Sequence, residues 1–149
     1  MANTTKLKRE YIFAVGRRKA AVARVRLYSL TSFMWGEMEI KQGEIAVNQI
    51  AVEKYFSGDV AKVIYTEPFK VTNTLGKYIV TAKIVGGGTR SQLEAFVHGV
   101  ARALNNVNNN EHRSSLKTHG LLTRDARVRQ RRTIGTGGKS RRQKQSPKR

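Results

Sequence analysis

The chain has 149 residues, the length of one ordinary domain, and it contains no cysteine, which excludes disulfides, thiolate metal sites and a cysteine nucleophile. Lys and Arg number 29 against 10 Asp and Glu, so the formal net charge is +19. A fold alone does not need this excess, so a polyanionic partner is its simplest explanation. The longest uncharged stretch, residues 27–36, is far shorter than the roughly 18 residues of a membrane-spanning helix. The N-terminus lacks the apolar stretch of a secretory signal, so we expect a cytoplasmic protein without a membrane partner.

The first elements read as two strands. Residues 11–15 form a short apolar run, residues 16–19 predict a turn, and residues 20–28 alternate between apolar and polar side chains. One face of the second strand carries Ala21, Ala23, Val25 and Leu27, and the other carries Arg24 and Arg26. The outward charges all have one sign, whereas mixed signs are typical of a merely soluble surface, so we interpret this face as part of a binding surface.

The middle of the chain is less regular. Residues 29–43 predict a hairpin loop or a small packing flap, and the spacing of Ile45, Val47 and Ile50 is typical of strands. Residues 52–56 predict a helical turn. Pro68 suits the first turn of another short helix, which we expect to end at residues 75–76.

The next segment predicts a strand over residues 78–85, followed at once by Gly86, Gly87 and Gly88. Ser91 and Glu94 match the S-x-x-E capping box that begins a helix. Apolar residues then recur at helical spacing: Leu93, Phe96, Val97, Val100 and Leu104. A second helix is expected from Asn110 through Leu116, closed by Gly120. Strands and helices mix without a regular repeat, so the expected class is α+β, with helices packed on a mixed sheet.

A strand, three glycines and a capped helix can bind phosphate through backbone N–H groups, but a tight turn needs the same small residues. The glycines are not a Walker loop, because no G-K-[ST] follows. The imidazoles show no metal-ligand spacing, and we expect His98 and Arg102 to share a polar edge of the helix. The residues suggest no catalytic constellation, metal site or cofactor, so we expect a protein that is not an enzyme.

The basic charge is concentrated at the C-terminus. Residues 111–149 hold 13 basic and two acidic residues, and Asp125 is the only acid from Thr123 onward. This stretch has too few large apolar residues to offset its chain entropy, so we expect it to be extended. We place a globular body at residues 1–122 and a basic tail at residues 123–149. Arginine dominates the tail, and its planar group suits bidentate contact with phosphate, so the tail predicts nucleic-acid binding.

Four blocks in order then resemble the small-subunit ribosomal protein S-nine family, in its bacterial type. They are residues 16–25 (GRRKAAVARV), 43–48 with 55–56 (GEIAVN, YF), 86–104 (triple glycine through HGVARAL) and 120–127 (GLLTRDAR). The terminal Lys148 and Arg149 also match. The resemblance implies a left-handed βαβ-type α+β fold like the second domain of ribosomal protein S-five. It also implies residence in the head of the small subunit, on 16S rRNA beside other head proteins, as one copy and not a homo-oligomer.

The resemblance further implies that the tail runs through rRNA towards the peptidyl site, where Lys148 and Arg149 would contact the anticodon stem-loop of the bound tRNA. The residues expected to bind rRNA are those of the cationic strand, the glycine turn, the helix edge and the tail: Arg17, Arg18, Lys19, Arg24, Arg26, Gly86, Gly87, Gly88, Arg90, Arg102, Arg124, Arg127, Arg129, Arg131, Arg132, Lys139, Arg141, Arg142 and Lys144. Two alternatives stay open from the residues alone. One is a free nucleic-acid chaperone or architectural DNA protein; the other is a phosphate-transferring enzyme that depends on Gly87.

Overall fold

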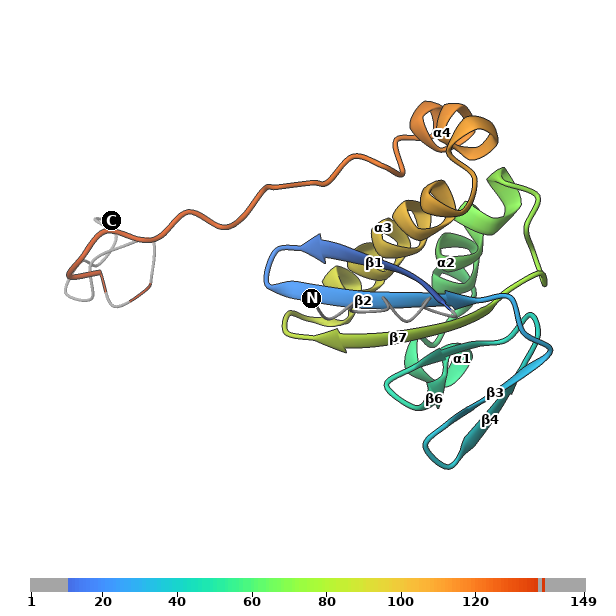
Figure 1. The fold of residues 1–149 in the computed structure, drawn as a ribbon. Helices are drawn as coiled ribbons and strands as arrows, with labels where there is room; N and C mark the ends of the chain where they lie inside the picture. The colour runs from blue at the N-terminus through green and yellow to red at the C-terminus, as the bar shows by residue number, and fades with distance from the viewer. Residues whose placement is uncertain (1–10, 137, 139–149) are drawn as a thin grey trace, which may run out of the picture.

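The computed structural model of the chain describes residues 11–136 and 138 (Figure 1). Its strands and helices mix as the sequence predicts, and the fold is α+β with a mixed sheet. In chain order the elements are β1 (Tyr11–Arg18), β2 (Ala21–Tyr28), β3 (Ser32–Trp35), β4 (Met38–Lys41), β5 (Ile45–Val47), β6 (Ile50–Ala51), α1 (Val52–Tyr55), α2 (Asp59–Val71), β7 (Ile79–Val85), α3 (Thr89–Val107) and α4 (Asn109–Thr118).

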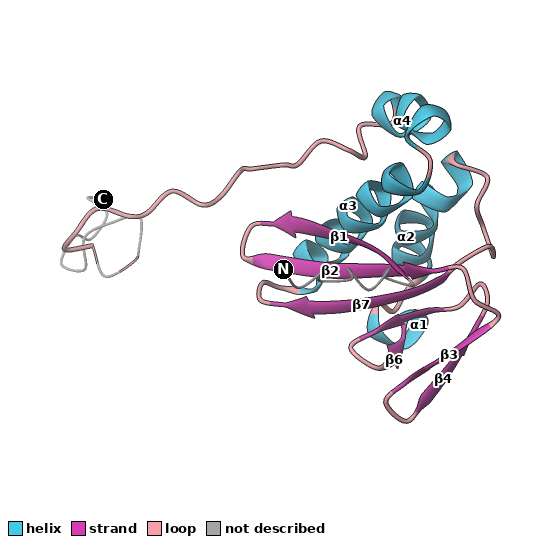
Figure 2. Cartoon of the chain, in the orientation of Figure 1, coloured by secondary structure: helices cyan, strands magenta, loops and turns pink. Residues whose placement is uncertain are grey.

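Five strands form one sheet in the order β1-β2-β7-β5-β6. The pairs β1–β2 and β2–β7 are antiparallel, whereas β5 runs parallel to β7, so the chain crosses between those two strands through α1 and α2. Helices α2 and α3 lie against one face of the sheet, and β3 and β4 form a separate hairpin at its edge (Figure 2). We call the helix-covered side the inner face and the opposite side the outer face.

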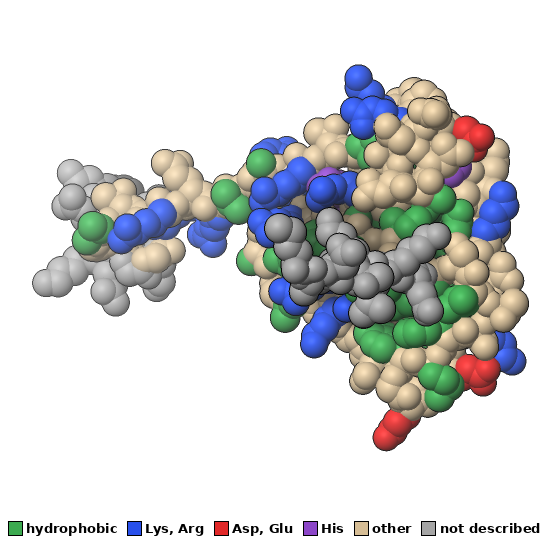
Figure 3. All heavy atoms as spheres, in the orientation of Figure 1, with side chains coloured by type: hydrophobic (Ala, Val, Ile, Leu, Met, Phe, Trp, Pro, Cys, Tyr) green, Lys and Arg blue, Asp and Glu red, His purple; other side chains and the backbone are tan. Residues whose placement is uncertain are grey.

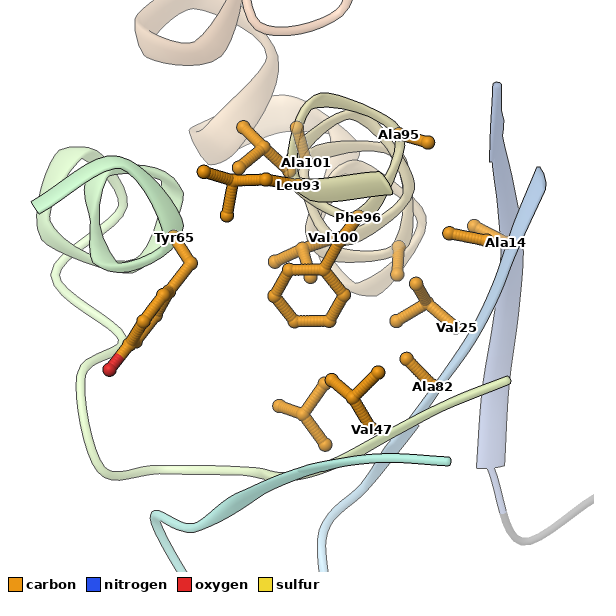
Figure 4. Close-up of a cluster of buried hydrophobic side chains, with 14 of the residues drawn as sticks. Ala14, Val25, Val47, Tyr65, Ala82, Leu93, Ala95, Phe96, Val100 and Ala101 are labelled. Carbon is orange, nitrogen blue, oxygen red and sulfur yellow. The ribbon is translucent and has the colours of Figure 1, made fainter. Parts of the chain in front are cut away.

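The core lies between the inner face and α2 and α3. Phe96 of α3 stands at its centre, between Val25 and Ala82 of the sheet and Tyr65 of α2 (Figure 4). The predicted apolar stripe of α3 is buried along its whole length, and the apolar side of β2 is buried as expected. A second, smaller cluster joins the sheet to the β3–β4 hairpin, which is the packing flap that the sequence allowed.

Two glycines let α3 approach the sheet closely. Gly16 of β1 faces Gly99 of α3, and a Cβ on Gly16 would overlap the carbonyl oxygen of Ala95 and the backbone of Gly99. A Cβ on Gly99 would in turn lie 2.7 Å from a methyl group of Val25. The first predicted strand therefore runs on through Gly16 to Arg18, where we expected a turn, and the turn begins only at Lys19, whose φ is 48°.

Two predicted helix starts are wrong. Helix α2 begins at Asp59, and Pro68 lies within its last turns, where it is buried with Tyr65 and Phe69. Proline near the C-terminal end removes one backbone donor, and the burial of this apolar side offsets that cost. Helix α3 begins at Thr89, so Ser91 lies inside the first turn and makes no cap; Gly88 is the N-cap residue.

After α4 the chain turns at Gly120 and leaves the body. Residues 124–132 contain no helix or strand, and they run away from the sheet and from the β3–β4 hairpin (Figure 1). Residues 126–135 are all exposed, and Arg127, Arg129, Arg131 and Arg132 are among them.

Candidate nucleic-acid interface

The outer face of the sheet brings cations from three strands together. Strand pairing places Val15, Arg24 and Lys83 in one row and Phe13, Arg26 and Thr81 in the next. Arg17 lies on the same face, one row beyond Arg24. We call Arg17, Arg24, Arg26 and Lys83 the cationic face. All four residues are exposed. Arg24 and Arg26 alternate with buried residues along β2, and Lys83 lies between two buried residues of β7.

Aromatic rings lie beside these cations. The Arg26 guanidinium sits 4.9 Å from the ring centroid of Tyr11, and Phe13, opposite Arg26, is 38 % exposed. The Tyr11 ring in turn packs on Tyr28 with centroids 5.6 Å apart. Guanidinium and ring surfaces of this kind offer both phosphate contact and stacking to a nucleic acid.

Within the described residues, no carboxylate pairs with the cationic face. Strands β1, β2 and β7 contain no Asp or Glu, and Arg24 stands directly opposite Lys83 in the sheet. Like charges across a strand pair are unfavourable, so an external anion would relieve a repulsion that the fold itself creates. Lys83 is not among the residues predicted from sequence, because its place beside Arg24 depends on the pairing of β7 with β2, two segments far apart in the chain.

Arg18 lies on the inner face, unlike its neighbour Arg17. Its side chain is only 11 % exposed, and its Nε is 2.6 Å from a carboxylate oxygen of Glu94 on α3. Its Nη2 is 3.1 Å from Asp125, and its Nη1 donates to the carbonyl oxygen of Arg127 at 2.9 Å. The structure thus gives Arg18, predicted to bind rRNA, an internal role: it ties the root of the tail to β1 and α3.

Asp125 is the second residue that connects the root of the tail to the body, at a contact we call the junction between face and tail. Arg127 donates from its backbone N–H and from its guanidinium to the Asp125 carboxylate, at distances from 2.7 to 3.1 Å. These bonds, with the nearby charge of Arg18, hold the pKa of Asp125 far below its usual range. The single acid of the tail therefore anchors it to the body, and Arg129, Arg131 and Arg132 beyond it stay exposed.

Close packing explains two of the three glycines in the turn at residues 86–88. Gly86 and Gly87 have φ of 74° and 67°, and side chains there would press on Ala20 and Ala21 at the β1–β2 turn. Gly88 alone faces open space. The two first glycines are thus required by the turn itself. Arg90, in the first turn of α3, is 93 % exposed and 3.5 Å from Glu94, which leaves it accessible to a partner.

His98 and Arg102 share an edge of α3 as expected, and that edge docks on β1. The Nδ1 of His98 accepts the Arg17 backbone N–H at 3.5 Å, and the Arg102 guanidinium donates to the Val15 carbonyl oxygen at 2.5 Å. Burial and the charge of Arg102 lower the pKa of His98. His98 is therefore a neutral bridge, whereas Arg102 keeps exposed donors.

Several predicted residues lie outside the part that the structure describes. They are Lys139, Arg141, Arg142, Lys144, Lys148 and Arg149. Lys19 and Arg124 are described and exposed, Lys19 at the β1–β2 turn and Arg124 at the root of the tail. For all the predicted rRNA-binding residues, contact with RNA stays a prediction.

Comparison with known proteins identifies the family. The family model described as ribosomal protein S9/S16 matches residues 16–149. The chain belongs to this family. The small ribosomal subunit protein uS9 of Maridesulfovibrio salexigens is 41% identical over 132 residues, covering 89% of this chain and 92% of that protein. The uS9 proteins of Leifsonia xyli subsp. xyli and Cutibacterium acnes are 42% and 43% identical over 122 residues, covering 82% of this chain and 66% and 64% of theirs.

Family membership confirms the resemblance read from the four sequence blocks. It supports a structural protein of the small ribosomal subunit that takes part in translation, in a family that is generally not enzymatic and typically binds rRNA. Within residues 11–136 and 138, no helix is both long enough and apolar enough to cross a membrane.

Proposed function

We propose that this chain is a structural constituent of the small ribosomal subunit, which binds 16S rRNA in the subunit head through its cationic face and its basic tail. The observation that carries this proposal is the cationic face: Arg17, Arg24, Arg26 and Lys83 converge from three strands that contain no carboxylate. In a member of this family, the matching polyanion is rRNA. The protein then works in the cytoplasm, bound to the ribosome beside other head proteins.

The tail extends this contact by a second route. Its exposed arginines follow one another along an extended backbone, so they can neutralise phosphates that a folded surface does not reach. Each phosphate neutralised releases counterions, and binding should therefore weaken steeply as salt rises. By the family resemblance, Lys148 and Arg149 at the end of this tail would contact the anticodon stem-loop of the peptidyl-site tRNA.

The cationic face is tested by charge reversal. We expect Arg24→Glu with Arg26→Glu to release the tagged chain from small subunits at lower salt in sucrose gradients, because two phosphate contacts become repulsive. Lys54→Glu with Lys70→Glu is the matched control, since it changes the net charge equally at exposed lysines of α1 and α2. Equal retention of the two variants through the salt series would contradict the proposal.

The same gradients distinguish the proposed ribosomal function from that of a free nucleic-acid chaperone. A chaperone or architectural DNA protein should bind duplex DNA as well as RNA and should not sediment with small subunits. An enzyme that transfers phosphate should show nucleotide turnover that is lost on changing Gly87, and the packing of Gly87 on Ala21 already explains that glycine without a nucleotide.

The tRNA contact is tested at the tip. Deleting residues 145–149 should leave assembly into subunits nearly intact and should speed dissociation of tRNA from the peptidyl site, because the phosphate contacts of Lys148 and Arg149 are lost. Filter-binding kinetics on purified subunits measure this rate. An unchanged dissociation rate in fully assembled subunits would contradict the proposed tRNA contact but not the proposed rRNA binding.

A further inference from the structure

A groove of about 590 Å³ lies on the side of the molecule away from the tail, between the β3–β4 hairpin, the sheet edge at β5 and helices α1 and α2. Its floor is apolar and buried, with Ile40, Val52, Tyr65, Phe69 and Val80 among the lining residues. Leu75, which is 61 % exposed, stands at its rim. The volume is that of a site which accepts a few side chains or a small ligand.

Carboxylates surround the mouth of this groove. Glu39, Glu44 and Glu53 line it and are exposed, and Lys62 is the only cation among its lining residues. Glu53 pairs with Lys62 at 3.2 Å, but both side chains are more than half exposed, so this ion pair is weak. Within the described part of the chain, Glu39 and Glu44 take part in no ion pair.

The groove belongs to a region whose charge differs from that of the rest of the chain. Residues 29–76 hold six of the ten acids, four lysines and no arginine, so the region is net negative by two in a chain of +19. Figure 3 shows part of this separation on the visible face: Lys and Arg gather on the side nearer the tail, whereas the visible Asp and Glu lie at the opposite margins, beside a few further Lys or Arg. A surface of this charge repels phosphate, so RNA is the wrong occupant.

We propose that this groove binds an extended cationic segment of a neighbouring protein, with an apolar side chain on the floor and Lys or Arg against Glu39, Glu44 and Glu53. The charge of the rim selects a basic partner, and the buried floor selects an apolar anchor. The chain's own tail leads in the opposite direction in its described part (Figure 1). The inference rests on the proposed function, because the partner is then another protein of the same subunit.

The test uses a photoreactive residue in assembled subunits. Leu75→p-benzoylphenylalanine places the probe at the groove, and Val85→p-benzoylphenylalanine places it at the end of β7, where the exposure is similar at 55 % but the neighbours are the cationic face and the glycine turn. Subunits are purified from cells in which the variant is the only copy of this chain. We expect the Leu75 probe to crosslink to a basic segment of a subunit protein, identified by mass spectrometry, and the Val85 probe to crosslink to rRNA.

Charge reversal at the rim tests the electrostatic part. Glu39→Lys with Glu53→Lys should lower the crosslinked fraction from the Leu75 probe about tenfold, because rim attraction becomes repulsion. Glu111→Lys with Glu67→Lys, an equal charge change at carboxylates that do not line the groove, should leave it unchanged.

The possible outcomes distinguish a failure of this inference from a failure of the proposed function. A Leu75 crosslink to rRNA, to a second copy or to this chain itself would overturn the inference, as would no crosslink in subunits that contain the variant. If neither variant enters subunits although both fold, the proposed function fails, and this inference fails with it.

Discussion

The cationic face and the tail segment 124–132 both expose cations, but they hold them in different ways. On the face, Arg24 and Arg26 alternate with the buried Ala23 and Val25, so the core fixes the spacing of the charges. In the segment no core residue fixes the arginines, and the only ion pairs are at its root, through Asp125. The face therefore presents a preformed pattern to folded RNA, whereas the segment must gain its final order from the partner.

The largest effect should come from separating α3 from the strands that carry the face. Gly16→Ser puts a side chain into the backbone of α3, and we expect it to cost about 3 kcal/mol or more of unfolding free energy. Gly88→Ser is the matched control: its Cβ meets open space at the N-cap position, where serine is favoured. Urea unfolding measures both, and similar stabilities for the two variants would contradict the close approach of Gly16 and Gly99.

Arg17 and Arg18 are adjacent in sequence, but Arg17 is exposed on the outer face and Arg18 is paired on the inner face. Arg18→Met removes the charged hydrogen bonds to Glu94 and to the tail root, and we expect it to cost about 2 kcal/mol of unfolding free energy. Arg17→Met changes an exposed side chain and should cost about 0.5 kcal/mol or less.

RNA affinity should rank these two variants in the opposite order at low temperature, where both are folded. Arg17→Met removes a phosphate ligand from the face and should flatten the dependence of log affinity on log salt by about one. Arg18→Met should leave that slope nearly unchanged. A larger loss of slope for Arg18→Met would show that Arg18 leaves its internal partners to bind RNA.

The elements that repeat a pattern along one stretch could be predicted from sequence. The alternation of β2 and the helical stripe of α3 identified both elements and their buried sides, because burial against a single layer leaves a periodic trace. The same two-residue alternation, extended along β1 to Arg18, would place Arg18 with Ala14 and Gly16 on the inner face. The sequence prediction ends the first strand at Val15 and therefore groups Arg18 with Arg17.

What sequence could not supply are contacts between distant segments. Glu94 matches a capping box with Ser91, yet its shortest ion pair is with Arg18, 76 residues away. Pro68 has the local preference of a helix start, and burial beside Tyr65 and Phe69 overrides that preference. Lys83 joins the cationic face only through its pairing with Arg24, which no local pattern in β7 reveals. The acidic groove likewise depends on the hairpin folding beside α1 and α2.

The smallest predicted effect concerns His98, which joins the two cationic regions. Its Nδ1 accepts the backbone N–H of Arg17 on the face. Burial, the charge of Arg102 and the charge of Arg124 at the root of the tail all lower the pKa of His98. Because burial and Arg102 lower the pKa of His98 in the folded chain, the unfolded chain takes up the proton more readily. This contribution to stability is fully present above the unfolded pKa of about 6.5 and is lost as pH falls below it.

His98→Gln keeps an acceptor and a donor but removes the titration, so its unfolding free energy should change less than that of the parent chain between pH 7.5 and 5. Urea unfolding at each pH measures this difference, and the effect should be modest because the imidazole is only partly buried. His119→Gln, at an exposed imidazole after α4, is the control. If His98→Gln and the parent lose stability in parallel, the imidazole is not held neutral, and the junction between face and tail depends on Arg18 and Asp125 alone.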